Sequence, residues 1–185
     1  MSPLRLTQIA RQLNRGAIIA YPTDTIWGLG CHPMLQKSVQ QIQQIKQRSL
    51  GKALILLASR LEQLLPYIDQ SIQHEHLVEL DKPAARPVTW LIRAGQHCPP
   101  WLTAGSDKVA VRLTSLSHID LLCSTLQAPL VSTSANISGR TTIRNSVLAH
   151  KQFRHSVDYI IEGFRTSTTR ASVIRDLQTG KILRA

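Results

Sequence analysis

The feature of this sequence that most restricts its fold is the alternation of amphipathic helical segments with short apolar runs. Apolar residues at helical spacing predict helices over residues 6–13, 35–45, 60–82, 117–127 and 143–153. Short runs rich in apolar residues predict strands over residues 17–21, 53–57, 87–93, 109–113, 157–161, 172–177 and 181–184. Helices that alternate with mostly apolar strands are typical of an α/β fold, and we expect one twisted, mixed sheet at its centre.

The length of the chain favours a single domain. With 185 residues and a hydrophobic fraction of 43%, it resembles an average globular domain and is long enough to bury a sizeable core. The sequence contains no internal repeat, low-complexity tract or linker, so we expect one domain over residues 1–185. Gln178-Thr179-Gly180 lies between the last two expected strands and predicts a hairpin there.

Cysteine usage and hydropathy point to a cytoplasmic protein without a membrane segment. No apolar run approaches the length of a membrane span, and residues 1–20 lack the long apolar region of a secretory signal. Cys31, Cys98 and Cys123 are odd in number and far apart, which favours reduced thiols over a disulfide framework or a zinc site. His74 and His76 have no third ligand at a suitable spacing, so we expect no protein-held metal.

The charge balance indicates a polyanionic partner. The chain has 22 Lys and Arg residues against 11 Asp and Glu residues, for a net charge of +11 and a pI near 10.3. An excess of this size favours RNA, a nucleotide or both, although an indifferent basic surface has the same composition. Aromatic residues make up only 4% of the chain, which argues against a platform that stacks the bases of single strands.

A run of hydroxyl and amide side chains follows the apolar residues 128–130, where we expect a strand to end. The run is Ser132-Thr133-Ser134-Ala135-Asn136-Ile137-Ser138-Gly139. Such side chains at the carboxyl edge of a strand can hold a polar ligand in a fixed position. The same residue types also form ordinary turns, so composition alone leaves both interpretations open.

Two other segments carry similar pairs of interpretations. The turn Thr23–Gly30 has two glycines that either let the backbone approach a ligand or simply allow a turn. Lys46, Arg48 and Lys52 surround a glycine and could cradle phosphates, although the dipole of the preceding helix also favours cations at its end. Arg112 lies within an apolar run, and a buried arginine needs an anionic partner or a ligand.

Taken together, five motifs in this order resemble the YrdC/TsaC family of threonylcarbamoyl-AMP synthases, which act in tRNA modification. The motifs are Tyr21-Pro22-Thr23-Asp24-Thr25-Ile26-Trp27-Gly28-Leu29-Gly30, Lys46-Gln47-Arg48 with Lys52, Pro87-Val88-Thr89, Val109-Ala110-Val111-Arg112, and the hydroxyl run from Ser132 to Gly139. The resemblance covers nearly the whole chain and corresponds to the compact bacterial form of the family.

The resemblance implies a three-layer α/β domain with a twisted mixed sheet and a basic concave groove. It also implies a reaction in which L-threonine and bicarbonate form a carbamate whose oxygen attacks the α-phosphate of ATP. Pyrophosphate leaves, and threonylcarbamoyl-AMP remains. The expected substrates are L-threonine, bicarbonate and ATP with Mg²⁺. Partner proteins would then transfer the threonylcarbamoyl group to the adenosine beside the anticodon of tRNA.

The family pattern assigns roles to individual positions of this sequence. The resemblance implies that three cations act in catalysis: Lys46, Arg48 and Lys52. It assigns the nucleotide to Arg48, Lys52, Ser134, Asn136 and Arg184. It assigns L-threonine to Thr25, Arg112, Ser132 and Ser172. One departure concerns Lys108, which stands where the family tends to carry a small hydroxyl residue.

Two alternatives use the same residues differently. A non-catalytic module that binds double-stranded RNA or tRNA would explain the net charge of +11 and the low aromatic content. Such a module has no need of Thr25, Arg112 and Ser132 around an amino-acid pocket. A hydrogenase-maturation protein with a related carbamoyl-adenylate domain is the other alternative, although nothing in this chain resembles the additional domains of those proteins.

Overall fold

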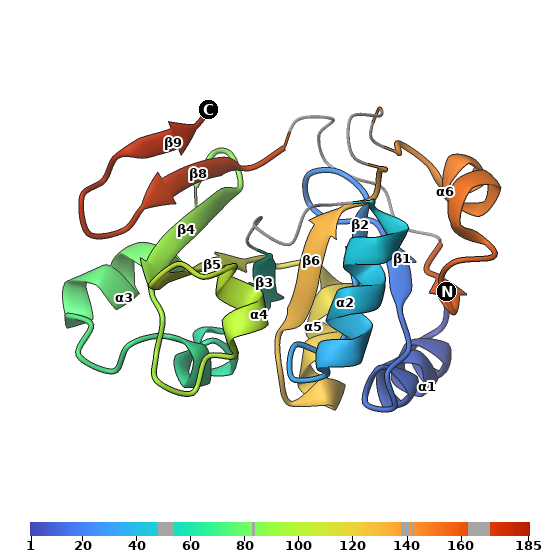
Figure 1. Ribbon diagram of the computed structural model, residues 1–185, viewed down its shortest axis with the longest axis horizontal. Helices are drawn as coiled ribbons and strands as arrows, with labels where there is room; N and C mark the ends of the chain where they lie inside the picture. The colour runs from blue at the N-terminus through green and yellow to red at the C-terminus, as the bar shows by residue number, and fades with distance from the viewer. Residues whose placement is uncertain (48–53, 83, 138–140, 142, 163–170) are drawn as a thin grey trace.

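One mixed sheet runs through the whole molecule (Figure 1). The structure is a computed structural model that describes residues 1–47, 54–82, 84–137, 141, 143–162 and 171–185. Within these residues the strand order is β7-β1-β2-β6-β3-β5-β4-β8-β9. The strands are β1 (Ile19–Tyr21), β2 (Gly28–Gly30), β3 (Ile55–Ala58), β4 (Val88–Arg93), β5 (Lys108–Leu113), β6 (Leu130–Ser134), β7 (Tyr159–Ile160), β8 (Val173–Asp176) and β9 (Ile182–Arg184). Three pairs are parallel (β1 with β7, β3 with β5 and β4 with β8), and the other five are antiparallel.

Helices cover both faces of this sheet. They are α1 (Pro3–Leu13), α2 (Gln36–Ile45), α3 (His74–Asp81), α4 (Pro100–Thr103), α5 (Ser117–Leu126) and α6 (Ser146–Phe153). Successive residues of a strand point to opposite faces. In β3, Leu56 packs in the core that includes α2, whereas Leu57 packs in the core that includes α1 and α5. The sheet therefore separates two apolar cores, which is the expected three-layer α/β architecture.

The segment 60–82 differs from the single helix that its apolar spacing predicted. It contains two short 3₁₀ turns, Leu61–Gln63 and Leu65–Tyr67, and only its last part forms α3. Pro66 has no backbone N–H to continue a helix. Beyond it, Ile68 forms a β-bridge with Ala94, and the Asp69 carboxylate accepts the backbone N–H of Ser71 at 2.9 Å. The helix prediction is therefore wrong for residues 68–73.

Two further strands differ from the elements that the sequence predicted. The first three hydroxyls of the run, Ser132 to Ser134, lie within β6 and do not follow it. Gly28–Gly30 forms a buried strand where the sequence predicted only a turn. A Cβ atom at Gly30 would lie 2.7 Å from the Tyr21 ring and 2.7 Å from the Val131 carbonyl oxygen. Glycine is needed there because of this close packing, a reason that neither earlier interpretation of the turn had included.

Most of the remaining elements overlap the predicted segments, although the short helix α4 was not predicted. The helix expected over residues 143–153 begins later, at Ser146, because the Asn145 side chain caps it by accepting the backbone N–H of Leu148 at 2.9 Å. The expected hairpin is present as β8 and β9, joined through a turn that ends at Gly180, whose φ is +68°. None of the described helices is long and apolar enough to cross a membrane.

Candidate functional site

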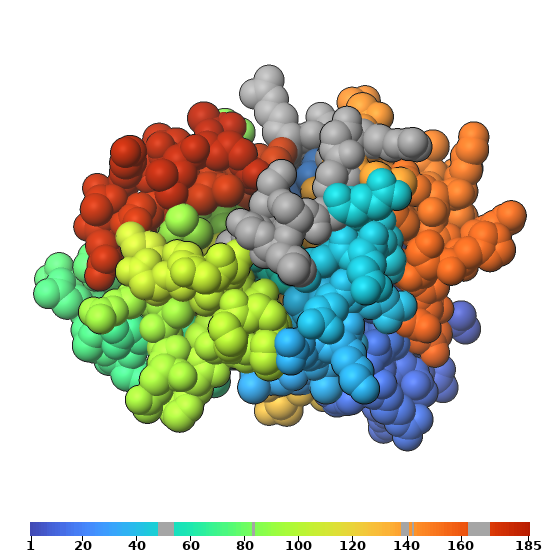
Figure 2. Space-filling view, viewed as in Figure 1, coloured from blue at the N-terminus to red at the C-terminus, as the bar shows by residue number. Residues whose placement is uncertain are grey.

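A pocket of about 660 Å³ opens above the middle of the sheet. Its polar lining residues are Thr23, Thr25, Lys46, Thr89, Arg112, Ser132, Thr133, Ser134, Asn136, Ser172 and Arg184. Apolar side chains that include Ile55, Leu91, Ala110 and Ile174 complete it. In the space-filling view, the hairpin β8–β9 (red) and helix α2 (cyan) stand on opposite sides of the centre of this face (Figure 2). Arg184 of β9 and Lys46 at the end of α2 line the pocket from these two sides.

The floor of the pocket is set by strand register. Ile55 of β3 pairs with Ala110 of β5 on one side and with Ser132 of β6 on the other. All three residues line the pocket. Leu57, two residues further along β3, points to the same face and packs in the core with α1 and α5. The pocket thus occupies the part of that sheet face next to the part that these helices cover.

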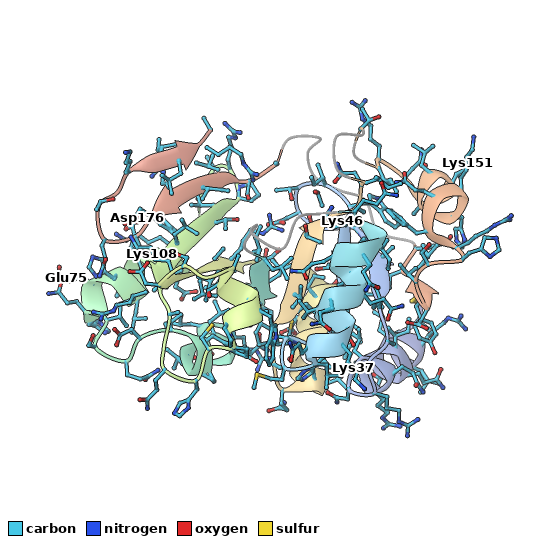
Figure 3. The ribbon with its side chains drawn as sticks, viewed as in Figure 1. Lys37, Lys46, Glu75, Lys108, Lys151 and Asp176 are labelled. Carbon is cyan, nitrogen blue, oxygen red and sulfur yellow. The ribbon has the colours of Figure 1, made fainter. Side chains whose placement is uncertain are left out.

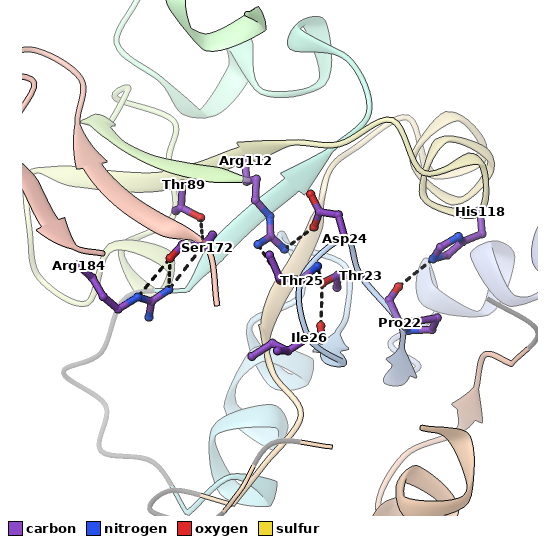
Figure 4. A network of polar contacts seen from close by, with 10 residues as sticks. All are labelled: Pro22, Thr23, Asp24, Thr25, Ile26, Thr89, Arg112, His118, Ser172 and Arg184. Carbon is purple, nitrogen blue, oxygen red and sulfur yellow. Dashed lines mark hydrogen bonds and ion pairs between the residues drawn. The ribbon is translucent and has the colours of Figure 1, made fainter. Parts of the chain in front are cut away.

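Arg112 is a buried cation of the pocket, with 3% of its surface exposed. Its Nη1 donates to Thr25 Oγ1 at 3.2 Å, and its Nη2 lies 3.4 Å from Asp24 Oδ1 (Figure 4). The side chain of Asp24 is itself only 16% exposed. The sequence required an anionic partner or a ligand for a buried Arg112, and Asp24 is that partner within the protein.

Hydrogen bonds hold the turn that carries Asp24 and Thr25. Thr23 Oγ1 lies 2.7 Å from the Ile26 carbonyl, to which it donates, and accepts the Thr25 N–H at 3.1 Å. His118 Nε2 lies 2.8 Å from the carbonyl of Pro22 (Figure 4). Burial lowers the pKa of His118, which favours a neutral ring whose N–H donates to that carbonyl. The turn therefore presents Asp24 and Thr25 to Arg112 in a fixed conformation.

Lys46 lies at the carboxyl end of α2, beside the end of β6 (Figure 3). Its ammonium group donates to the carbonyl of Asn136 at 2.9 Å, to Asn136 Oδ1 at 3.2 Å and to Ser134 Oγ at 3.4 Å, and it also contacts the Ser134 carbonyl. Ser134 Oγ donates to Asn136 Oδ1 at 2.7 Å. These contacts join the end of a helix to the end of a strand and hold both at the rim of the pocket.

A second polar cluster closes the side of the pocket formed by β4, β8 and β9. Thr89 Oγ1 and Ser172 Oγ are 2.7 Å apart. Arg184 donates to the Ser172 carbonyl from Nη2 at 2.9 Å and from Nε at 3.3 Å (Figure 4). Burial, and secondly the neighbouring charge of Arg112, lower the pKa of Arg184. Two guanidinium groups therefore face the same pocket, an arrangement suited to anionic ligands.

The structure brings together eight of the ten residues that the resemblance assigned to the site. These eight line the pocket: Thr25, Lys46, Arg112, Ser132, Ser134, Asn136, Ser172 and Arg184. Arg48 and Lys52 lie outside the described residues. The roles of all ten residues stay predictions, because proximity to a pocket does not identify the ligand of each side chain.

Sequence reasoning overlooked three polar residues of the pocket region: Thr23, Asp24 and Thr89. Thr23 and Asp24 belong to the first of the five motifs, and Asp24 is its one carboxylate. Because a buried Arg112 needs an anionic partner, this carboxylate could have been identified as a candidate. Asp24 is also the last acidic residue before Glu62. Thr89 alternates with apolar neighbours in a strand, a pattern that does not reveal which hydroxyl it contacts.

Lys108, the departure from the family pattern, does not line the pocket. Its ammonium group forms an ion pair with Asp176 on β8. The hydrogen bond from Lys108 is the main cause of the lowered pKa of Asp176. Asp176 Oδ1 also accepts the backbone N–H of Gln178 at 3.1 Å and of Thr179 at 3.0 Å. Lys108 thus anchors the turn between β8 and β9.

Among the residues that the structure describes, no group of three or more His, Cys, Asp or Glu side chains is arranged to hold a metal ion. The described cysteines are unpaired thiols, and burial raises the pKa of Cys98 to about 11 and that of Cys123 to about 12. Such thiols stay protonated near neutral pH and are poor nucleophiles. Among the described residues, the polar groups that line the pocket are cations, hydroxyls and the Asn136 carboxamide.

Comparison with known proteins gives a consistent result. The model of the Sua5/YciO/YrdC family, described as "Telomere recombination", matches residues 11–185. The threonylcarbamoyl-AMP synthase of Pseudoalteromonas translucida is 37% identical over 173 residues, which cover 93% of this chain and 92% of the relative. The threonylcarbamoyl-AMP synthase of Nitrosococcus oceani is 39% identical over 181 residues and 97% of each chain.

Solved structures agree with this assignment. Sua5 of P. abyssi, solved in complex with L-threonine, superposes with a TM-score of 0.89 at 25% identity. The match covers 98% of this chain and 53% of the P. abyssi protein, so the present chain spans about half the length of that relative. Because the family model covers most of the chain and the relatives match it almost from end to end, this protein belongs to the Sua5/YciO/YrdC family.

Proposed function

We propose that this protein is a threonylcarbamoyl-AMP synthase. It converts L-threonine, bicarbonate and ATP into threonylcarbamoyl-AMP, pyrophosphate and water. The observation that supports this proposal is full-length similarity, at 37% and 39% identity, to proteins that carry this name. The pocket is consistent with it, because cations and hydroxyls surround a space of about 660 Å³ that suits a ligand larger than an amino acid alone.

The L-threonine end of the pocket lies around Arg112. A guanidinium group can bind a carboxylate through two parallel hydrogen bonds. Arg112 is oriented by Asp24 and Thr25, so it meets the amino acid without first having to adopt a new rotamer. The hydroxyls of Ser132 and Ser172 supply further donors and acceptors beside it. Together they hold the amino group of L-threonine near the position where it becomes a carbamate.

The nucleotide end includes Ser134, Asn136 and Arg184, to which we add Arg48 and Lys52 from the family pattern. The carbamate oxygen forms a bond to the α-phosphorus of ATP, while the bond from that phosphorus to the bridging oxygen breaks. Catalysis of phosphoryl and nucleotidyl transfer depends mainly on positioning and on neutralising charge. Lys46 orients the turn from Ser134 to Asn136, and its positive charge stabilises pyrophosphate as it leaves.

ATP enters as its Mg²⁺ complex, so the metal ion arrives as part of the substrate. Mg²⁺ is commonly bound through the phosphates with only one or two protein ligands. That mode needs no cage of acidic side chains in this protein. The product then serves tRNA modification, in which partner proteins transfer the threonylcarbamoyl group to the adenosine beside the anticodon.

The catalytic proposal explains the pocket better than a non-catalytic RNA-binding module does. Phosphate contacts with a duplex come mainly from exposed cations on a surface. Arg112, by contrast, is buried and paired with Asp24, and its hydroxyl neighbours are buried too. Such a site suits a small ligand that fills a pocket.

The decisive experiment measures pyrophosphate release by the purified protein with ATP, Mg²⁺ and bicarbonate, with and without L-threonine. We expect release that requires both L-threonine and bicarbonate. L-Valine, which is close to L-threonine in shape but has no hydroxyl, is the matched control substrate. Absence of release, together with tight and salt-dependent binding of tRNA, would instead support the RNA-binding alternative.

A further inference from the structure

The hydroxyl of Thr89 is a buried group of the pocket to which the proposed reaction gives no role. Thr89 lies on β4 with 0% of its surface exposed, and Ser172, just before β8, is 3% exposed. Their hydroxyl oxygens are 2.7 Å apart, the usual distance for an O–H···O hydrogen bond. Both residues line the pocket. The Thr89 side chain therefore contacts a residue that we assign to the L-threonine end.

The backbone of Ser172 is fixed from the opposite side. Arg184 donates two hydrogen bonds to its carbonyl, at 2.9 Å and 3.3 Å. Val173, the next residue, pairs with Val88 at the start of the ladder between β4 and β8. With the main chain held in this way, the principal freedom left to Ser172 is rotation of its hydroxyl. Figure 4 shows that Thr89 and Arg184 approach Ser172 from different strands.

Thr89 is well suited to restrict that rotation. A β-branched side chain in a strand has few accessible rotamers, and β4 holds Thr89 between β5 and β8. Its hydroxyl therefore has a fixed position relative to the floor of the pocket. A hydroxyl can donate one hydrogen and accept others. When Thr89 donates to Ser172, the hydrogen of the Ser172 hydroxyl is left to donate into the pocket.

We infer that Thr89 is a positioning residue for amino-acid recognition: it donates to Ser172 Oγ and thereby directs the Ser172 hydroxyl hydrogen toward an oxygen of L-threonine. The inference rests on the proposed function, since it assumes that Ser172 contacts the amino acid. The oxygens of a carboxylate or carbamate only accept hydrogen bonds, so a Ser172 that contacts them has to donate. Arg184 Nη2 also donates to Ser172 Oγ, at 3.5 Å, and Thr89 supplies the nearer donor, at 2.7 Å, that makes this direction favourable.

The test compares Thr89→Val, which removes the hydroxyl at nearly constant volume, with Thr89→Ser, which keeps it. The matched control is Thr103→Val. Thr103 is also buried, at 6% exposure, and donates to the Pro100 carbonyl at 3.2 Å in α4, outside the pocket. Pyrophosphate release gives the KM for L-threonine and the KM for ATP separately. Thermal unfolding reports whether each variant is folded.

We expect Thr89→Val to raise the KM for L-threonine about tenfold, the effect of a lost or misdirected hydrogen bond, with the KM for ATP within about twofold of wild type. We expect Thr89→Ser to keep a KM for L-threonine close to that of wild type, and Thr103→Val to change neither constant. The inference is overturned if Thr89→Val raises both KM values equally or raises neither. It is also overturned if Thr89→Ser raises the KM for L-threonine as much as Thr89→Val does. If Thr89→Val unfolds, Thr89→Ala removes the same hydroxyl without adding an atom, and the same criteria apply.

Direct calorimetric titration of L-threonine separates this inference from the proposed function. If wild-type protein binds L-threonine but releases no pyrophosphate, the synthase proposal fails. The inference about Thr89 is then tested by the Kd of the Thr89 variants for L-threonine. If wild type releases pyrophosphate while Thr89→Val binds L-threonine as tightly as wild type, the synthase proposal stands and the inference about Thr89 is wrong.

Discussion

Two cations of the pocket, Arg112 and Lys46, are equally buried but contact different kinds of partner. Each has 3% of its surface exposed. Arg112 forms an ion pair with the carboxylate of Asp24, whereas Lys46 donates to the neutral oxygens of Ser134 and Asn136. Removal of one member of a buried ion pair leaves a charge in the protein interior, and loss of a donor to neutral oxygens costs less. Burial alone therefore does not predict what each cation contributes to stability and to activity.

The strongest test of this comparison is Arg112→Met. We expect the free energy of unfolding to fall by about 3 kcal/mol, because the Asp24 carboxylate is left without its guanidinium partner. L-Threonine-dependent pyrophosphate release is expected to disappear as well. Urea unfolding and the pyrophosphate assay measure the two effects on the same preparation.

The double variant Arg112→Met with Asp24→Asn separates stability from function. It removes both charges, so we expect much of the lost stability to return while activity stays absent. Arg60→Met is the matched control, because Arg60 and Asp120 form an ion pair at the surface with side chains 61% and 45% exposed. Its removal is expected to cost less than about 1 kcal/mol. A loss as large as that of Arg112→Met would contradict the comparison.

Lys46→Met is expected to affect turnover more than stability. Loss of its charge from the rim of the pocket should lower kcat about 100-fold, as happens when one stabilising donor is removed from a transition state. The Ser134 and Asn136 oxygens lose a donor but carry no charge, so we expect the free energy of unfolding to fall by about 1–2 kcal/mol. A variant with unchanged kcat would show that Lys46 only braces the turn.

Arg184 connects the two ends of the pocket and sharpens the comparison further. Arg184→Gln is expected to raise the KM for ATP about tenfold and the KM for L-threonine about threefold, since the residue also holds the Ser172 carbonyl. Arg93→Gln is the control, because Arg93 is 64% exposed in a surface pair with Asp69. Steady-state kinetics with each substrate varied in turn would reveal a result in the opposite order, which would argue against a nucleotide role for Arg184.

The smallest expected effect is a pH dependence of stability at the Arg112 end. Burial lowers the pKa of His118 in the folded protein below the value of about 6.5 in an unfolded chain. Between these two pKa values the unfolded chain binds a proton that the folded protein does not. The contribution of His118 to the free energy of unfolding is therefore fully present above about pH 6.5. It declines as the pH falls toward the folded-state pKa, by at most about 1.4 kcal/mol per pH unit for one proton.

Unfolding midpoints measured from pH 8 to pH 5 check this expectation. His118→Gln can still donate to the Pro22 carbonyl but does not titrate, so its stability should vary less over that range. Since burial also lowers the pKa of His32, part of the slope is expected to remain in His118→Gln.

The sequence was sufficient to predict most of the layers, because they depend on local apolar periodicity. The α/β class and most helices and strands followed from it. It was insufficient for β2, where Gly28-Leu29-Gly30 lacks the β-branched residues that mark a strand. It also missed the breaks around Pro66, where apolar spacing continued although the backbone could not continue a helix.

The sequence predicted the residues of the site better than their contacts, because these contacts join distant segments. The positions of Arg112 and of the hydroxyl run could be recognised within motifs. The partners could not: Asp24 and Thr25 reach Arg112 only because of where the turn after β1 lies relative to β5. Strand register brings Ile55 between Ala110 and Ser132, and a one-residue change of register would turn these side chains to the other face.

The contacts that build the pocket also bear on when it forms. Arg112 meets Thr25 across 87 residues of sequence, Ser172 meets Thr89 across 83 and Asn136 meets Lys46 across 90. Contacts of such long range form late and slow the folding of a domain. A partly folded chain can therefore possess its local helices and hairpin while it lacks these long-range contacts of the ligand site. For this protein, gain of activity during refolding reports that these contacts between distant segments have formed.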